Sequence, residues 1–123
     1  MVLYWDNEFY FNNYLNSIFN LEDKVVVVTG AGGHLCGEMA RGYANAGCKV
    51  VVADLRIEKA NDVVKQITDA GNDCALAIEA DVSTKEGHDK VLTETLKTFD
   101  KVDVLVNGAG INGSTPFFKI SLE

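Results

Sequence analysis

Proline is almost missing from this sequence: one Pro stands among 123 residues, beside 11 glycines. No segment has the composition of a disordered chain, and 47% of the residues are hydrophobic, which is enough for a globular core. No apolar run approaches the length of a membrane span. The N-terminus has no positively charged region, and Asp6 and Glu8 interrupt it, so we expect neither a membrane anchor nor a signal peptide.

Basic residues are also scarce. Lys and Arg number 11 against 18 Asp and Glu, the net charge is −7, and no basic cluster stands out. We therefore expect no nucleic-acid or anionic-membrane partner, because both require concentrated positive charge. The spacing of Cys36, Cys48 and Cys74 suits neither zinc nor a disulfide framework. All three have apolar neighbours in the sequence, which predicts buried free thiols in a reducing compartment and hence a cytoplasmic protein.

Residues 1–20 differ from the rest of the chain, because they are rich in aromatic residues and contain no Lys or Arg. Phe11, Leu15, Ile18 and Phe19 have helical spacing, so one interpretation is an interface helix. The alternative is a leader that packs loosely on the domain. A membrane-surface helix is disfavoured because basic residues are missing.

From Lys24 onward, strand and helix patterns alternate. Continuous apolar runs predict buried strands at residues 25–28, 50–53, 75–78 and 102–106. Three helices fill the intervals, with Gly47 and Gly71 as stops and Ser83 with Glu86 as a capping box. The expected buried stripes are Leu35, Met39, Tyr43 and Ala46; then Ile57, Ala60, Val63, Val64, Ile67 and Ala70; then His88, Val91, Leu92, Thr95 and Phe99.

This alternation, with links of only a few residues, demands right-handed crossovers and a parallel sheet covered on both faces. The predicted fold class is α/β, the first half of a Rossmann-type doubly wound parallel sheet with strand order 3-2-1-4. We expect an N-terminal aromatic extension over residues 1–20 and a dinucleotide-binding domain over residues 21–123.

A glycine-rich stretch, TGAGGHLCG at residues 29–37, joins the first strand to the first helix. A phosphate held there would meet backbone N–H groups and the positive end of a helix dipole. The alternative is a turn that merely connects the two elements. Its position after a four-valine strand and before an amphipathic helix favours nucleotide binding.

Asp54 ends the second strand, at the distance from the glycine turn where a ribose hydroxyl is bound. A carboxylate there accepts a hydrogen bond from the 2′-OH and repels a 2′-phosphate, which favours NAD over NADP. Arg56 is close enough to accommodate such a phosphate, so NADP stays open. The alternative is a capping Asp before the second helix.

Two further turns, Asp81-Val82 and residues 107–110, also follow the carboxyl ends of strands, where ligands bind in open α/β sheets. Each of them alone is an ordinary turn. Together, TGAGGHLCG, ADLR, ADVS and NGAG resemble the motifs of the short-chain dehydrogenase/reductase family, in order and at the family's spacing. The resemblance covers residues 21–123. It is closest to members acting on sugars and polyols, such as gluconate 5-dehydrogenase and mannonate oxidoreductase-like proteins.

The resemblance implies a nicotinamide cofactor site. The glycine loop would line the pyrophosphate and the nicotinamide ribose, and Asp54 would bind the adenosine ribose. Asp81 and Val82 would bind the adenine, and the turn at residues 107–110 would pass under the ribose. The implied residues are Gly30, Gly32, Gly33, His34, Leu35, Asp54, Arg56, Asp81, Val82, Asn107, Ala109 and Gly110. The motif differs at three positions: His34 and Cys36 replace glycines of the loop, and Gly108 replaces the second asparagine of Asn-Asn-Ala-Gly.

In the family that these motifs resemble, a Tyr-x-x-x-Lys pair carries out acid–base catalysis, and this sequence contains no such pair. A complete member has about 250 residues, the size of one α/β domain. We therefore expect Glu123 to end a fragment that is inactive alone. The predicted function is the cofactor-binding half of an NAD(P)-dependent oxidoreductase that interconverts an alcohol, such as a sugar or polyol, and a ketone.

The substrate would be a small molecule, and residues 114–118 are the stretch here expected to touch it. Members of the family are usually homo-oligomeric, and we expect this chain to self-associate. The alternatives are a nucleotide-binding module without chemistry and a gene fragment without function.

Overall fold

The computed structural model describes residue 14 and residues 17–111. Most of the aromatic extension and the stretch 114–118 lie outside the described residues, so the interpretations of both stay predictions. Among the described residues, no helix combines the length and apolar character needed to cross a membrane.

A parallel sheet of four strands lies at the centre, in the order β3-β2-β1-β4. The strands are β1 (Val25–Thr29), β2 (Lys49–Asp54), β3 (Ala75–Glu79) and β4 (Val104–Val106). The predicted order 3-2-1-4 is therefore confirmed. The fourth strand is shorter than predicted, because Val102 is exposed and the ladder with β1 begins at the pair Val26–Val104.

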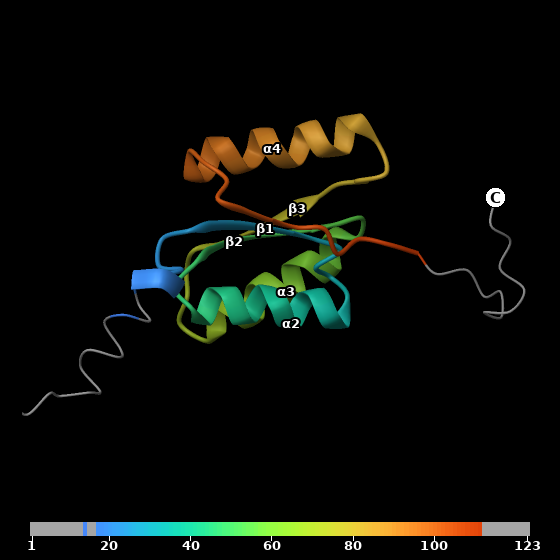
Figure 1. The fold of residues 1–123 in the computed structure, drawn as a ribbon. Coiled ribbons are helices and arrows are strands. Elements are labelled where there is room, and N and C mark those ends of the chain that lie inside the picture. The colour runs from blue at the N-terminus through green and yellow to red at the C-terminus, as the bar shows by residue number, and fades with distance from the viewer. Residues whose placement is uncertain (1–13, 15–16, 112–123) are drawn as a thin grey trace, which may run out of the picture.

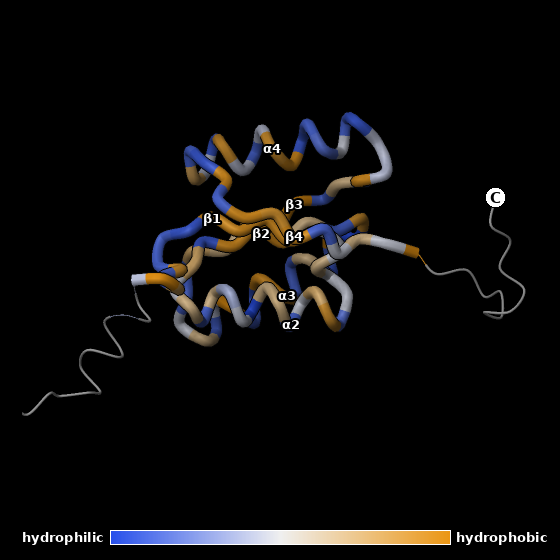
Figure 2. Tube along the Cα trace, in the orientation of Figure 1, coloured by the Kyte–Doolittle hydropathy of each residue, from blue (hydrophilic) through white to orange (hydrophobic). Residues whose placement is uncertain are grey.

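Helices cover both faces of the sheet, as predicted. The helices α2 (His34–Asn45) and α3 (Ile57–Asp69) lie on one face, and α4 (Lys85–Phe99) lies on the other (Figure 1). Side chains along each strand alternate between the two faces. Val26 and Val28 pack toward α2 and α3, whereas Val27 packs toward α4, and for this reason the run has to be apolar throughout. The hydropathy colouring places the apolar strands between the three helices (Figure 2).

The buried face of α2 differs from the predicted one. Leu35 and Met39 are exposed, with 66% and 41% of their surface accessible. The buried residues are Cys36, Gly37, Ala40 and Ala44. These residues are small, so the helix can approach the sheet closely, and the glycine loop before it sets the rotation that turns them inward. The predicted stripe of α3 is largely confirmed, because Ala60, Val63 and Ile67 are buried.

The start of α4 also differs from the prediction. Thr84, not Ser83, is the N-cap, and its hydroxyl oxygen accepts a hydrogen bond from the Gly87 N–H at 3.0 Å. Gly87, Val91 and Thr95 are buried, whereas His88 and Leu92 of the predicted stripe are exposed. The reason is that Gly87 packs closely on Asp81. This contact rotates α4 so that Gly87, Val91 and Thr95, which are spaced four residues apart, face the sheet. Gly47 and Gly71 end the preceding helices with φ of +85° and +95°, as expected of stops.

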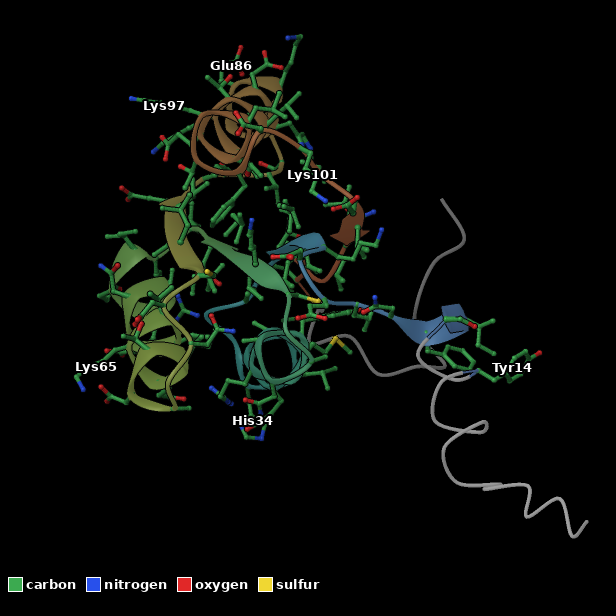
Figure 3. The ribbon with its side chains drawn as sticks, turned by 90° about the vertical axis from the view of Figure 1, so that its left-hand side faces the viewer. Tyr14, His34, Lys65, Glu86, Lys97 and Lys101 are labelled. Atoms are coloured by element: carbon green, nitrogen blue, oxygen red, sulfur yellow. The ribbon has the colours of Figure 1, made fainter. Side chains whose placement is uncertain are left out.

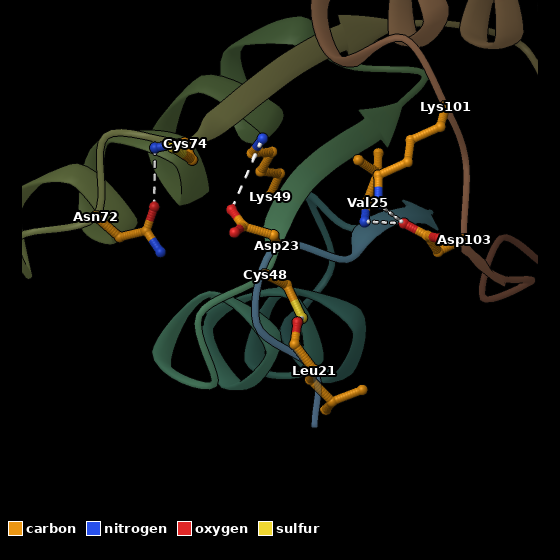
Figure 4. A network of polar contacts seen from close by, with 9 residues as sticks. All are labelled: Leu21, Asp23, Val25, Cys48, Lys49, Asn72, Cys74, Lys101 and Asp103. Atoms are coloured by element: carbon orange, nitrogen blue, oxygen red, sulfur yellow. Dashed lines mark hydrogen bonds and ion pairs between the residues drawn. The ribbon is translucent and has the colours of Figure 1, made fainter. Parts of the chain in front are cut away.

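The prediction of three buried cysteines is wrong for Cys74, which is exposed. Cys36 and Cys48 are buried, and none of the three forms a disulfide. Cys48 donates a hydrogen bond to the Leu21 carbonyl at 3.2 Å, and burial raises the pKa of its thiol (Figure 4). Cys74 is exposed because it stands in the turn before β3, where its backbone N–H bonds the Asn72 side chain at 2.8 Å.

Candidate cofactor site

A cleft of about 830 Å³ lies where the carboxyl ends of the four strands meet. Residues that follow each of the four strands line it, so segments far apart in the sequence come together there. Its lining residues are Gly30, Gly33, His34, Leu35, Cys36, Ala53, Asp54, Leu55, Arg56, Ala80, Asp81, Val82, Ser83, Gly108, Ala109, Gly110 and Ile111. All predicted site residues are among them except Gly32 and Asn107. Binding by these residues stays a prediction.

The glycine loop and the turn after β4 fit into one another. Gly30 has a φ of +68°, and a Cβ there would lie 2.8 Å from Ala109 Cα. Thr29 strengthens this junction, because its hydroxyl oxygen accepts hydrogen bonds from the N–H groups of Gly108 at 3.1 Å and Ala109 at 3.2 Å. Sequence reasoning assigned no role to Thr29; its position between a strand and a glycine loop was the available signal.

The N-terminus of α2 opens on this cleft. Gly33 occupies the N-cap in an extended conformation, so no side chain caps the helix, and its first turn contains no acidic residue. No acidic residue of the helix itself therefore complements the positive end of the helix dipole. His34 lines the cleft with its neighbours, but its side chain is exposed and lies on the side of α2 away from the sheet (Figure 3).

Asp54 is a buried carboxylate with only 8% of its side chain exposed. One oxygen, Oδ2, accepts the Gly32 N–H at 2.9 Å, and the other, Oδ1, accepts the Arg56 N–H at 3.0 Å. Asp54 thus ties the glycine loop to the end of β2. A carboxylate offers about four acceptor positions, so capacity remains for a hydroxyl in the cleft.

Gly32 and Arg56 both lie close to the Asp54 carboxylate. A Cβ at Gly32 would lie 2.8 Å from Asp54 Cγ, so glycine is needed for the loop to reach it. The Arg56 guanidinium Nε lies 3.7 Å from Asp54 Oδ1, and the arginine side chain is 60% exposed. Arg56 therefore faces the cleft with its charge turned partly toward Asp54.

Asp81 organises the turn that leads into α4. Its Oδ1 accepts hydrogen bonds from the Ser83 hydroxyl at 2.6 Å and the Ser83 N–H at 2.9 Å. These bonds, the hydroxyl first, lower the pKa of Asp81, so the residue is an anion at neutral pH. Ser83 was not predicted as a site residue, although an Asp followed two residues later by Ser is a signal for such a turn.

The remaining predicted residues are less closely involved. Asn107 is exposed and lies outside the cleft lining.

In the described part of the chain, no three His, Cys, Asp or Glu side chains gather as metal ligands would. Apolar residues that sequence reasoning missed, Leu55 and Ile111, complete the walls of the cleft.

The strand order, the uncapped helix after a glycine loop and the acidic residue that ends β2 are features of the Rossmann-type α/β fold. The family model for short chain dehydrogenase matches residues 24–123. The chain therefore belongs to the short-chain dehydrogenase family, as its motifs indicated, and members of this family bind nicotinamide cofactors.

Three known proteins illustrate the similarity. An uncharacterized oxidoreductase, UxuB of Bacillus subtilis, is 43% identical over 93 residues, which are 76% of this chain and 33% of the relative. An NAD-dependent glycerol dehydrogenase of Listeria innocua is 39% identical over 93 residues, 76% of this chain and 35% of the relative. The crystal structure of a 3-ketoacyl-(acyl-carrier-protein) reductase from Brucella melitensis complexed with NADH superposes with a TM-score of 0.69 at 42% identity.

That superposition covers 74% of this chain and 36% of the reductase. The chain thus spans about a third of the length of the proteins that it matches.

Proposed function

We propose that this chain is the cofactor-binding portion of an NAD-dependent oxidoreductase that interconverts an alcohol, of the sugar or polyol class, and the corresponding ketone. The observation that carries the proposal is the single cleft in which the turns after all four strands meet. The similarity to a glycerol dehydrogenase and to a reductase complexed with NADH supports it. When bound, the nicotinamide supplies the hydride chemistry.

The residues present fit a dinucleotide. Gly30, Gly33 and Leu35, with His34 beside them, would hold the phosphates at the uncapped start of α2. Asp81 and Val82 would bind the adenine. The turn that follows Asn107, with Ala109 and Gly110, would carry the nicotinamide ribose, while Gly32 would act through its bond to Asp54.

The preference for NAD rests on Asp54. Its anionic carboxylate has acceptor capacity left for a ribose hydroxyl and would repel a 2′-phosphate at the same place. Arg56, the group able to accept such a phosphate, is partly engaged by Asp54 at 3.7 Å. The proposal therefore places NADH above NADPH in affinity.

Calorimetric titration of the whole chain with NADH and NADPH tests this ranking. Asp54→Asn should reduce the preference, because the amide is uncharged and its NH₂ group cannot accept the hydrogen bond from a backbone N–H. Asp62→Asn, an exposed residue on α3, changes the net charge equally and should leave the preference intact. Equal affinity of the wild-type chain for the two cofactors would contradict the proposal.

This chain would bind the cofactor but would not catalyse proton transfer, since its sequence contains no Tyr-x-x-x-Lys pair. Assays across polyols and sugar acids with either cofactor should show no turnover. Reduction of the cofactor in proportion to the protein concentration would refute this assignment. We also propose a cytoplasmic location, as the sequence predicted.

A further inference from the structure

Cys36 and Gly108 meet at the floor of the cleft. Cys36 belongs to the first turn of α2, and Gly108 belongs to the turn after β4. The thiol of Cys36 donates to the Gly108 carbonyl with Sγ and O 3.7 Å apart, and the cysteine is 8% exposed. Both residues line the cleft, so their packing forms part of its wall.

Gly108 has no space for a side chain, because both Cys36 and the backbone of Thr29 lie too close to it. A Cβ at residue 108 would lie 2.3 Å from Cys36 Sγ and 2.8 Å from the Thr29 carbonyl oxygen. The next contact, Cys36 Cβ, would be at 3.5 Å, which is an ordinary van der Waals distance. The sulfur atom is therefore the nearest obstacle, and the backbone oxygen is the second.

The same turn is also held by Thr29 and Gly30. The N–H groups of Gly108 and Ala109 bond to Thr29 Oγ1 at 3.1 and 3.2 Å, and Ala109 packs against the position where a Cβ of Gly30 would stand. A change at Cys36 would therefore remove one contact of the turn and leave those with Thr29 and Gly30 in place.

We propose that Cys36 is a positioning residue whose side chain, packed on Gly108, sets where the turn 108–110 runs beneath the nicotinamide half of the dinucleotide. This inference rests on the proposed function. It gives one physical cause to two departures from the family motif, the cysteine at a glycine position and the glycine at an asparagine position. The two residues then form a matched pair, in which the sulfur atom of Cys36 occupies space that the absence of a side chain at Gly108 leaves open.

A double-mutant cycle on the full chain tests the pair, with Cys36→Ala, Gly108→Ala and the double variant titrated with NADH and with 5′-AMP. In the wild-type background, Gly108→Ala should lower NADH affinity about tenfold, as expected for overpacking against a rigid neighbour. In the Cys36→Ala background the same change should lower NADH affinity by a clearly smaller factor, because the clash with the sulfur atom is removed and only the clash with the Thr29 carbonyl oxygen remains.

The affinity for 5′-AMP separates positioning from general damage, because AMP occupies the adenosine end at Asp54 and Asp81, away from the turn. It should change by less than about twofold in every variant. Gly42→Ala is the matched control for Gly108→Ala. Gly42 lies in α2, as Cys36 does, and nothing lies within 4 Å of the new Cβ. Cys74→Ala, an exposed free thiol, is the matched cysteine control.

An equal loss of NADH affinity in both backgrounds would overturn the proposal, and so would an equal loss of AMP and NADH affinity. Failure of the wild-type chain to bind NADH would refute the proposed function, and the positioning role with it. The same cycle measured on urea unfolding midpoints needs no cofactor, so it shows independently whether the two residues are coupled. Additive midpoints would overturn the pair even if NADH binds.

Discussion

The two faces of the sheet are covered to different extents. Among the described residues, α2 and α3 close one face over a cluster of twelve buried residues, whereas α4 is the one helix on the other face and covers a cluster of six. Adjacent strands lie about 4.8 Å apart and a helix is about 10 Å across, so one helix cannot cover four strands. Leu92 and Leu96 of α4 and Leu105 of β4 are accordingly exposed.

The difference matters for the site, because the cleft lies at the edge that both faces share. The glycine loop leads into α2 on the closed face, and the turn of Asp81 leads into α4 on the open face. We infer that stability comes mainly from the closed face, while the open face governs association with other molecules.

The largest effect is expected in the closed face, at Ile67, which is 2% exposed. Ile67→Ala should lower the free energy of unfolding by about 2–5 kcal/mol, through lost burial and a cavity. Urea unfolding followed by circular dichroism measures it. A loss below about 1 kcal/mol would show that this face is not the main core.

A somewhat smaller effect is expected where α4 joins the sheet. A Cβ at Gly87 would lie 1.9 Å from the Asp81 carbonyl oxygen, so Gly87→Ala must displace the helix or the turn. We expect a loss of about 1–3 kcal/mol, whereas Gly42→Ala, with open space around it, should be neutral or stabilising. Similar unfolding midpoints for the two variants would contradict the close packing of α4.

A pH-dependent effect is expected at the opposite end of the sheet, where Asp103 joins β1 to β4. Its Oδ2 accepts the Val25 N–H at 2.8 Å and pairs with the Lys101 ammonium at 2.8 Å (Figure 4). The bond from Lys101 first, and that from Val25 second, lower the pKa of Asp103 in the folded state. Its contribution is therefore complete above the unfolded-state pKa of about 3.9 and is lost as the pH falls through the lower folded-state value.

Asp103→Asn should accordingly be less stable than the wild-type chain at pH 7, and the two should converge in strongly acidic solution. Unfolding midpoints measured across that range test the sign. A difference that stays constant from neutral to acidic pH would show that the charge of Asp103 contributes nothing. Asp62→Asn, at an exposed position, is the control for the change in net charge.

The smallest effect on stability is expected on the open face, at Leu92 and Leu105. Leu92→Gln with Leu105→Lys should change the free energy of unfolding by no more than about 0.5 kcal/mol per substitution, because both side chains are already at least half exposed. Self-association of the chain, measured by light scattering, should decrease, since apolar surface at a sheet edge promotes pairing. Met39→Gln, a comparably exposed residue on α2, should leave association unchanged.

The order of elements, the parallel sheet and the position of each turn that lines the cleft could be predicted from the amino-acid sequence. These follow from local and periodic signals: continuous apolar runs for strands buried on both faces, helical spacing between them, and glycines at the stops. Topology rules then place the carboxyl ends of the strands along one edge, which predicts that Gly30, Asp54, Asp81 and Ala109 lie around one site.

Which face of each helix is buried, and how the turns support one another, depends on tertiary packing. One residue along a helix rotates the side chain by about 100°, so a stripe of Leu35 and Met39 and a stripe of Cys36 and Ala40 are both compatible with the pattern. The small residues are buried because α2 packs closely on the sheet, as the glycine loop directs it. The bond from the Gly32 N–H to Asp54 and the contact of Cys36 with Gly108 join residues 22 and 72 positions apart, and no local signal encodes such distances.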